Sequence, residues 1–193
     1  MITDQELVAR TLSGDQTAFS DLVEAYQQSV YNVTYRMLGN QREAEDAAQE
    51  AFLRAYQHLG RYDPSRSFKT WLLSIASNHC IDRIRKRRLT WLSIDEPLPP
   101  HPALSSAEPG PEASVMHGER EEAMQELLGE LAPDYRAAVV LRYWYDMSYA
   151  EIAETLETTE SAIKSRLFRA RQMLAEHVRS GKVPGLTVAV EGA

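Results

Sequence analysis

The sequence has almost no cysteine and no long hydrophobic run. Cys80 is the only cysteine among 193 residues, so an internal disulfide and a multi-cysteine metal site are both excluded. The longest purely aliphatic run is the five residues 137–141, whereas a membrane-spanning helix needs about 20 apolar residues. The start of the chain carries acids at Asp4 and Glu6 and lacks the apolar centre of a signal peptide. We therefore expect a cytoplasmic protein that does not insert into membranes.

Catalytic and phosphate-binding patterns are also missing. No glycine-rich loop that could cradle a phosphate occurs in the sequence. His79 and Cys80 are adjacent, and neighbouring residues of a helix point about 100° apart. They cannot act on each other as a base and its nucleophile. The sequence predicts that the protein is not an enzyme and needs no metal or other cofactor.

Proline is scarce outside one stretch. Six of the nine prolines lie between residues 96 and 111, among serines and acids. Such a composition buries too little apolar surface to offset the entropy cost of ordering. We predict a flexible linker at 89–118 that joins a first domain at 1–88 to a second domain at 119–180. A short tail follows at 181–193.

Patterns of β-strands are absent, whereas signals for helices recur. Thr3 and Glu6 match a capping box, and apolar residues recur every three or four positions from 16 to 38. Gly39 is expected to end that helix. The second domain shows four further helical stretches, at about 119–131, 133–145, 149–156 and 159–178. The sequence predicts an all-α fold made of two small helical domains.

Charge is unevenly distributed along a chain whose net charge is −7. Residues 61–91 carry eight bases and two acids, and residues 160–182 carry six bases and two acids. Between them, residues 92–134 carry ten acids and one base. Two basic islands in an acidic chain predict contact with a polyanion. The acidic stretch either competes with that polyanion for the islands or only keeps the linker soluble.

The first basic island lies at the end of a helix expected from about 67 to 88. A helix C-terminus attracts one or two cations through its dipole, but five lie here: Arg83, Arg85, Lys86, Arg87 and Arg88. A polar strip on one face of this helix leads into the cluster; it consists of Ser74, Asn78, Ile81 and Arg85. Upstream, Phe68 and Trp71 alternate with basic residues, a pattern that suits an unstacked nucleic-acid strand. Each of these two rings also fits a core position.

The second basic island forms the later part of a two-helix motif. Ser148 and Glu151 match a capping box for a short helix, and a tight turn near 157–159 leads to a longer one. One side of the longer helix is apolar from Ile163 to Val178, and the other side is polar and basic. This layout is typical of a helix-turn-helix that reads a major groove. An αα-hairpin with a solvated basic face would show it too.

A third feature is the alanine-rich helix expected around 44–56. Its alanines pack inward and leave a polar face outward, which consists of Asp46, Gln49 and Glu50. By itself, this pattern indicates no more than a solvated face.

Together these segments resemble the sigma-70 family of bacterial RNA polymerase, and in particular its extracytoplasmic-function (ECF) members. The stretches GDQTAFSDLVEAYQQSVY, AEDAAQEAFLRAY and FKTWLLSIASNHCIDRIRKRR resemble the second conserved region of that family. The stretch LAPDYRAAVVLRYWYDMSYAEIAETLETTESAIKSRLFRARQML resembles its fourth region. The first and third regions of larger members are missing, which is the ECF pattern. The segment 181–193 resembles nothing that we can assign.

The resemblance implies specific roles for these residues. The face of Asp46, Gln49 and Glu50 would dock on the clamp helices of the polymerase β′ subunit. Asn78 would read a base flipped from the non-template strand of the minus-10 element, in a pocket walled by the loop from Asp63 to Ser67. Residues Arg83, Arg85, Lys86, Arg87 and Arg88 would hold the nearby promoter backbone. The helix at 159–172 would read the minus-35 element through Ser161, Lys164, Ser165, Arg166, Phe168 and Arg169.

The resemblance also implies partners. These are the polymerase core, including its β subunit, promoter DNA and an anti-sigma factor. A stand-alone helix-turn-helix regulator is the alternative. It would bind an operator tightly without polymerase, usually as a dimer.

Overall fold

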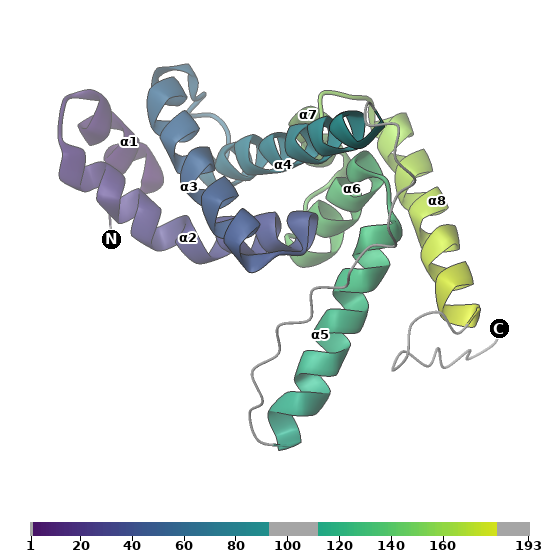
Figure 1. Ribbon diagram of the computed structural model, residues 1–193. Helices are drawn as coiled ribbons and strands as arrows, with labels where there is room; N and C mark the ends of the chain where they lie inside the picture. Colours follow the sequence, from purple (N-terminus) through teal and green to yellow (C-terminus); the bar gives the residue numbers. More distant parts are fainter. Residues whose placement is uncertain (1, 93–111, 181–193) are drawn as a thin grey trace.

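The computed structural model describes the backbone of residues 2–92 and 112–180, and the side chains of 2–87, 89 and 121–180 (Figure 1). All secondary structure in these ranges is helical and no strand occurs there, which confirms the predicted all-α fold. The α-helices are α1 (Asp4–Leu12), α2 (Gln16–Leu38), α3 (Gln41–His58), α4 (Phe68–Leu92), α5 (Glu112–Glu130), α6 (Pro133–Trp144), α7 (Tyr149–Thr155) and α8 (Glu160–Arg179). None of them is long and apolar enough to cross a membrane.

Local signals in the sequence set the helix ends of the first lobe, α1 to α4. Thr3 and Glu6 form the expected capping box of α1. Gly39 ends α2 in the left-handed region, with a φ of 74°, which glycine adopts without steric cost. The Asn40 side chain then accepts a hydrogen bond from the Glu43 backbone N–H at 3.0 Å and starts α3. These ends agree with the sequence prediction.

Two helices are longer than predicted. Helix α4 continues to Leu92 and α5 begins at Glu112, so the predicted linker 89–118 is helical at both ends. No proline or glycine stands between Phe68 and Leu92 to stop α4, and several good helix formers follow Glu112. Residues 93–111 lie outside the described part, so the division into domains stays a prediction.

The second lobe, α5 to α8, ends in the expected two-helix motif. Ser148 and Glu151 form the capping box of α7. The turn after α7 holds Glu157 with a φ of 48°, and Thr159 caps α8 by accepting a hydrogen bond from the Ala162 N–H. The predicted apolar stripe of α8 packs inward: Ile163, Leu167 and Ala170 are buried and Leu174 and Val178 are half-buried.

The two lobes pack against each other around one continuous hydrophobic core. At the C-terminus of α2, Gln125 donates to the carbonyls of Tyr35 and Arg36 at 3.2 and 3.1 Å. Buried Arg136 donates to the carbonyl of Met37. The last four carbonyls of a helix have no partner inside the helix, so side chains of the second lobe complete the end of α2.

Gly39 also permits this close approach. A Cβ at this position would lie 3.3 Å from the Nε2 atom of Gln125, in addition to the strain of its positive φ. The sequence predicts Gly39 as a helix stop but does not predict its contact with the other lobe.

Aromatic residues at the end of α6 complete the contact between the lobes. The Tyr145 hydroxyl donates to the Ser29 carbonyl at 2.6 Å, and burial raises the pKa of Tyr145 to about 12. The Arg36 guanidinium lies 4.4 Å from the centre of the Trp144 ring, and the Lys69 ammonium lies 5.5 Å from that of Tyr145. The interface therefore combines apolar packing, hydrogen bonds and cation–π contacts.

Candidate nucleic-acid interface

The polar face of α3 is exposed, as the sequence predicts. Asp46 and Gln49 are exposed and Glu50 is half-buried, above alanines that are buried. We call these three residues the docking face. The Arg54 side chain lies 2.7 Å from Glu50 and, mainly by this hydrogen bond, holds the pKa of Glu50 below its usual value.

An apolar groove runs beside the docking face, between α2 and α3. Its volume is about 570 Å³, and it is lined by Gln16, Phe19, Val23, Gln49, Phe52, Leu53 and Tyr56. Leu53 is 58% exposed and Tyr56 is 47% exposed. Sequence reasoning missed this groove, although two large apolar residues at outward positions of α3 were the available signal.

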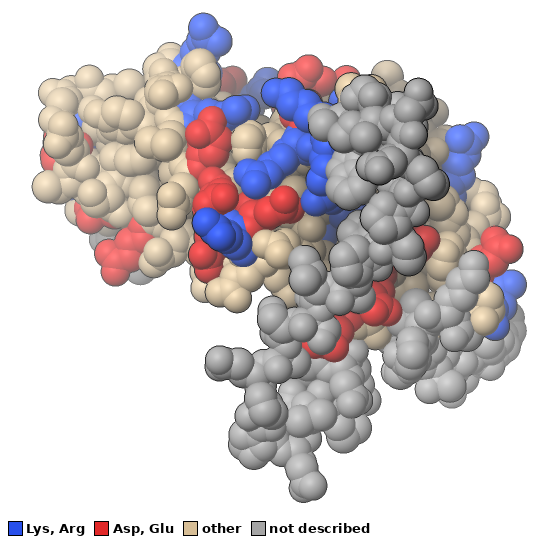
Figure 2. Space-filling view, in the orientation of Figure 1, with Lys and Arg blue, Asp and Glu red and all other residues tan. Residues whose placement is uncertain are grey.

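The docking face lies next to the basic end of α4. The Arg83 guanidinium lies 3.9 Å from Glu43 and 4.0 Å from Asp46, and Arg87 lies 3.2 Å from Glu43. Acidic and basic side chains are accordingly mixed in the middle of the side of the molecule that Figure 2 shows. Exposed pairs such as these contribute about 0–1 kcal/mol each, so the cations stay available to other anions. Lys86 is exposed, and the Arg88 side chain lies outside the described residues.

Two residues of the polar strip of α4, Asn78 and Arg85, bind the second lobe, although Arg85 is also exposed to solvent. The Asn78 amide donates to the Thr155 carbonyl at 3.0 Å, and Arg85 lies 2.8 Å from Asp134. Ile81 is buried, and the Ser74 hydroxyl donates to the Trp71 carbonyl. A pocket of about 230 Å³ remains between α4, α6 and the end of α7; it is lined by Asn78, Ile81, Asp82, Arg85, Asp134, Leu156 and Glu157.

The loop from Asp63 to Ser67 meets the same end of α7. The Ser65 backbone N–H donates to Asp63 at 2.9 Å and, with the Ser65 hydroxyl, holds the pKa of that carboxyl below its usual value. Arg66 forms an ion pair with Glu154. Because Glu154 precedes Thr155 in α7, the loop and Asn78 converge on one turn of helix.

The aromatic residues around this loop belong to the core. Phe68 is 1% exposed and its ring centre lies 5.5 Å from Tyr62 and 5.7 Å from Trp71. Trp71 is half-buried. For Phe68, the core interpretation is correct.

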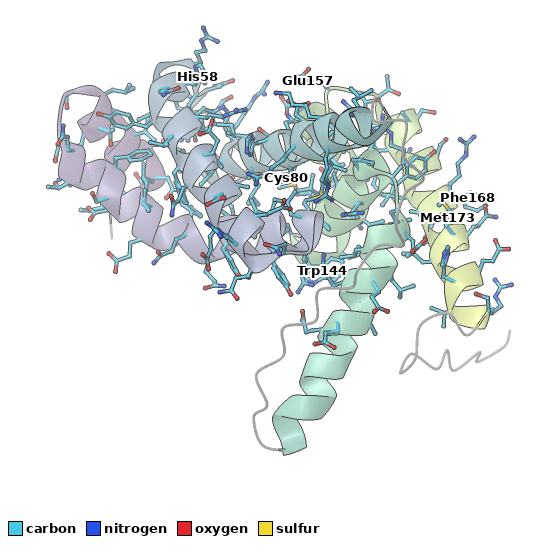
Figure 3. The ribbon with its side chains drawn as sticks, in the orientation of Figure 1. His58, Cys80, Trp144, Glu157, Phe168 and Met173 are labelled. Atoms are coloured by element: carbon cyan, nitrogen blue, oxygen red, sulfur yellow. The ribbon has the colours of Figure 1, made fainter. Side chains whose placement is uncertain are left out.

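The polar side of α8 is open to solvent. Five of its six predicted residues are exposed: Ser161, Lys164, Ser165, Phe168 and Arg169. Arg166 is half-buried, and its Nη1 lies 3.8 Å from Asp134. Phe168 points away from the molecule (Figure 3) and is 55% exposed. We call these six residues the reading face.

Cys80 lies inside the first lobe (Figure 3). It is buried, and this burial raises the pKa of its thiol to about 12. The thiolate is the reactive form of cysteine, so Cys80 is a packing residue.

Two family models match the chain: sigma-70 region 2 over residues 22–90 and sigma-70 region 4 over residues 121–174. The chain is 37% identical over 177 residues to the ECF RNA polymerase sigma factor SigW of Bacillus subtilis (strain 168), covering 89% of this chain and 95% of SigW. It is 32% identical over 184 residues to the ECF RNA polymerase sigma-E factor of Escherichia coli (strain K12), covering 92% and 95%. The solved structure of CnrH in complex with the cytosolic domain of CnrY shares 25% identity and a TM-score of 0.66, covering 92% of this chain and 97% of CnrH.

The chain therefore belongs to the sigma-70 family; the region 2 match ends within the last turn of α4 in the first lobe, and the region 4 match lies within the second lobe. Within that family it is an ECF RNA polymerase sigma factor, because the ECF relatives match along nearly their whole length. These matches do not assign roles to single residues, so those roles stay predictions.

Proposed function

We propose that this chain brings core RNA polymerase to specific promoters in the cytoplasm, where it acts as a binding protein and not as an enzyme. In this proposal α3 docks on the polymerase, α8 reads the minus-35 element, and α4 opens and holds the minus-10 element. The apolar groove beside Gln49 carries the proposal, because it adjoins the docking face and lies between α2 and α3, apart from the helix-turn-helix.

The groove suits an amphipathic helix from a partner. Exposed apolar patches with a polar rim mark protein-binding sites, and a helix in a groove is a common way to fill one. Leu53 and Tyr56 supply the apolar surface, and Gln49 lies at the edge as a hydrogen-bonding group. The clamp helices of β′ are the occupant that membership of the ECF family favours.

The reading face supplies the groups that a major groove needs. Arg and Lys donate to guanine, and apolar side chains contact the methyl group of thymine. Arg169, Lys164 and Phe168 are exposed on one side of α8, whose other side packs on its own lobe. The recognition helix of a helix-turn-helix contacts bases with its N-terminal residues, and this is the part of α8 that carries these three.

The polar strip and the basic end of α4 have different roles at the minus-10 element in this proposal. Asn78 has a donor and an acceptor on one amide and so can read a base edge. Arg83 and Arg87 carry charges that suit phosphates. The loop containing Asp63 lies near Asn78 through their common contact with α7, which supports a joint pocket.

The test is run-off transcription with core polymerase on DNA fragments from upstream of the gene that encodes this chain. We expect transcripts only when both chain and core are present. Leu53→Ser should abolish them by placing a hydroxyl in the groove. Leu12→Ser is the matched control, because Leu12 on α1 is 57% exposed and lies outside the residues that line the groove.

Two results would contradict the proposal. One is transcription that Leu53→Ser and Leu12→Ser leave equally intact. The other is tight binding of the same fragments by the purified chain alone, unchanged by core, which would favour the stand-alone regulator.

A further inference from the structure

The loop that follows Tyr62, residues 63–67, is closed on itself at Asp63. The Ser65 backbone N–H donates to the Asp63 carboxylate at 2.9 Å, and the Arg66 backbone N–H donates to the Asp63 carbonyl at 3.0 Å. All five residues of the loop are exposed, so their side chains are open to a ligand. A turn that is closed internally can still move as a unit, so its position depends on contacts with the rest of the lobe.

Tyr62 fixes the end of the loop that lies nearest α4. Its hydroxyl donates to the Arg66 carbonyl at 2.5 Å. Tyr62 is 7% exposed, and its ring centre lies 5.5 Å from that of Phe68 and 5.3 Å from that of Trp71. Because a packed core side chain keeps a defined position, this hydrogen bond ties the Arg66 carbonyl to the core.

A residue of α1 fixes the opposite end of the loop. The Gln5 side-chain amide donates to the Pro64 carbonyl at 2.6 Å, across 59 positions of the chain. Proline has no backbone N–H, so the carbonyl is the only polar main-chain group by which Pro64 can be held. Gln5 therefore anchors the part of the loop that the Tyr62 hydroxyl does not reach.

Helix α1 is a firm support for this contact. Leu7 and Val8 are buried, and the Tyr26 hydroxyl donates to the Asp4 carboxylate at 2.6 Å. Asp4 directly precedes Gln5, so the first turn of α1 is tied to α2. The contacts at both ends of the loop lie within the first lobe, so they do not depend on where the second lobe lies.

We propose that Gln5 is a positioning residue for minus-10 recognition, which holds the Pro64 carbonyl and thereby sets how far the 63–67 loop lies from Asn78. This inference rests on the proposed role of that loop and Asn78 in binding a flipped base. A site rejects the wrong base by a clash or an unpaired polar group, and this requires walls placed to within about 0.5 Å. A loop released at Pro64 keeps its turn but can shift to admit a wrong base. Helix α1, to which the sequence assigns no function, thus contributes to promoter selectivity.

Two substitutions of Gln5 separate the hydrogen bond from the side chain that makes it. Gln5→Met removes the donor and keeps the length, the neutral charge and the helix propensity. Gln5→Lys keeps a donor on a side chain long enough to reach the same carbonyl. The matched control is Gln28→Met, because Gln28 is an exposed glutamine of α2 whose amide donates to Asn32 in the same helix at 2.9 Å. It lies outside the residues that line the apolar groove.

The first experiment measures the loop without DNA. Hydrogen exchange followed by mass spectrometry reports on the backbone N–H groups of Ser65 and Arg66, which donate within the turn. Gln5→Met should raise their exchange rate about twofold to tenfold, which is the shift in a local equilibrium that one lost hydrogen bond produces. Gln5→Lys should restore slow exchange, and Gln28→Met should not change it. Equal exchange in Gln5→Met and the unmodified chain would overturn the anchoring.

The second experiment measures selectivity in the complex of the full chain with core polymerase. The template is a fragment from upstream of the gene that encodes this chain, with its minus-10 positions randomised, and the templates held in heparin-resistant complexes are sequenced. The readout is the ratio of the preferred base to the other three at each position, which a uniform change in affinity does not alter. Gln5→Met should lower this ratio about twofold to tenfold at the position of the flipped base. Gln5→Lys should recover it, and Gln28→Met should keep it.

Three results would overturn the positioning role of Gln5. One is an unchanged ratio in Gln5→Met, and another is an equal fall in Gln28→Met. The third is a fall that Gln5→Lys does not reverse, because the hydrogen bond would then not be its cause. Failure of the proposed function would look different, since the unmodified chain would then give no core-dependent complexes on any template.

Discussion

Asn78 and Arg87 sit on the same helix but are suited to different tasks. Asn78 donates one hydrogen bond to a neutral carbonyl, whereas the Arg87 guanidinium donates to the charged carboxylate of Glu43. An amide distinguishes bases by which groups they present, and a guanidinium on a phosphate does not. The two residues should therefore separate sequence recognition from general affinity.

We predict that Asn78→Ala lowers promoter opening mainly on templates with the matched minus-10 sequence. Arg87→Ala should weaken all templates alike and reduce the slope of log affinity against log salt by about one contact. Run-off transcription on a set of minus-10 variants, at several salt concentrations, measures both effects. A uniform loss with both substitutions would show that this division of roles is wrong.

Glu157 is a residue under backbone strain in the turn between α7 and α8. Its φ is 48°, a region that costs a residue with a Cβ about 1–2 kcal/mol. Glycine avoids this cost but loses about 0.5–1 kcal/mol through its larger unfolded-state entropy. We predict that Glu157→Gly raises the free energy of unfolding by up to about 1 kcal/mol in urea titrations. Thr158→Gly, at an ordinary φ, should lower it.

At the scale of elements, α3 presents three different surfaces along one helix. Alanines face the core, Asp46 and Gln49 face solvent, and Leu53 and Tyr56 edge the groove. In such a helix, the residues proposed to bind a partner are separate from those that pack in the core.

We predict that Asp46→Ala/Gln49→Ala changes the free energy of unfolding by less than about 0.5 kcal/mol, as is usual for surface sites. The same double substitution should weaken binding to core polymerase. The control is Gln41→Ala/Glu45→Ala, which removes an amide and an acid from the same helix, where they pair at 3.0 Å. A collapse of the fold, or equal loss of binding in the control, would contradict the docking role.

Helix α2 depends on an ionised cap at its start. The Asp15 carboxylate accepts hydrogen bonds from the Thr17 hydroxyl and from the backbone of Thr17 and Ala18. The Thr17 hydroxyl first, and Arg10 next, lower the pKa of Asp15 to about 2, from 3.8. Because the folded pKa is lowered, this stabilisation is complete above about pH 4 and is lost as the pH falls towards 2.

We therefore predict that Asp15→Asn lowers the Tm at pH 7, and that the difference from the unmodified chain shrinks between pH 4 and pH 2. Asparagine still caps the helix, so the substitution removes mainly the charge. Thermal unfolding followed by circular dichroism at pH 7, 4 and 2.5 provides the measurement. A constant difference across this range would count against the ionised cap.

At the scale of the molecule, the sequence predicts helix ends, which depend on a few neighbouring residues. It does not predict the contacts between the lobes, which depend on residues far apart in the chain. Caps such as Thr3 and Ser148, and the stop at Gly39, depend on neighbours three or four positions away. Arg136 and Gln125 bind carbonyls of residues 89 to 99 positions away. Main-chain carbonyls carry no sequence signature, so the interface between the lobes could not be predicted.

The same limit affects the predicted competition by the acidic middle of the chain. Asp134 belongs to the acidic stretch 92–134 and does pair with Arg85. Glu154, which pairs with Arg66, lies outside that stretch, and residues 93–111 are outside the described part. Specific carboxylates on folded helices thus meet the basic surface, a role that charge counting alone does not reveal.

An interface of this kind should hold the lobes together even when the chain between them is cut. We predict that a chain with a protease recognition sequence inserted within 93–111, folded and then cleaved, elutes from gel filtration as one complex.

Gln125→Ala/Tyr145→Phe removes three hydrogen bonds between the lobes, and each contributes about 0.5–1.5 kcal/mol. Their loss should weaken the association about tenfold to a thousandfold, so the cleaved variant should elute as two fragments at the same concentration. Gln172→Ala, an exposed substitution on α8, should leave the complex intact. Separate elution of the cleaved, otherwise unmodified lobes would contradict this prediction and would mean that the lobes stay together only through the effective concentration that the covalent link provides.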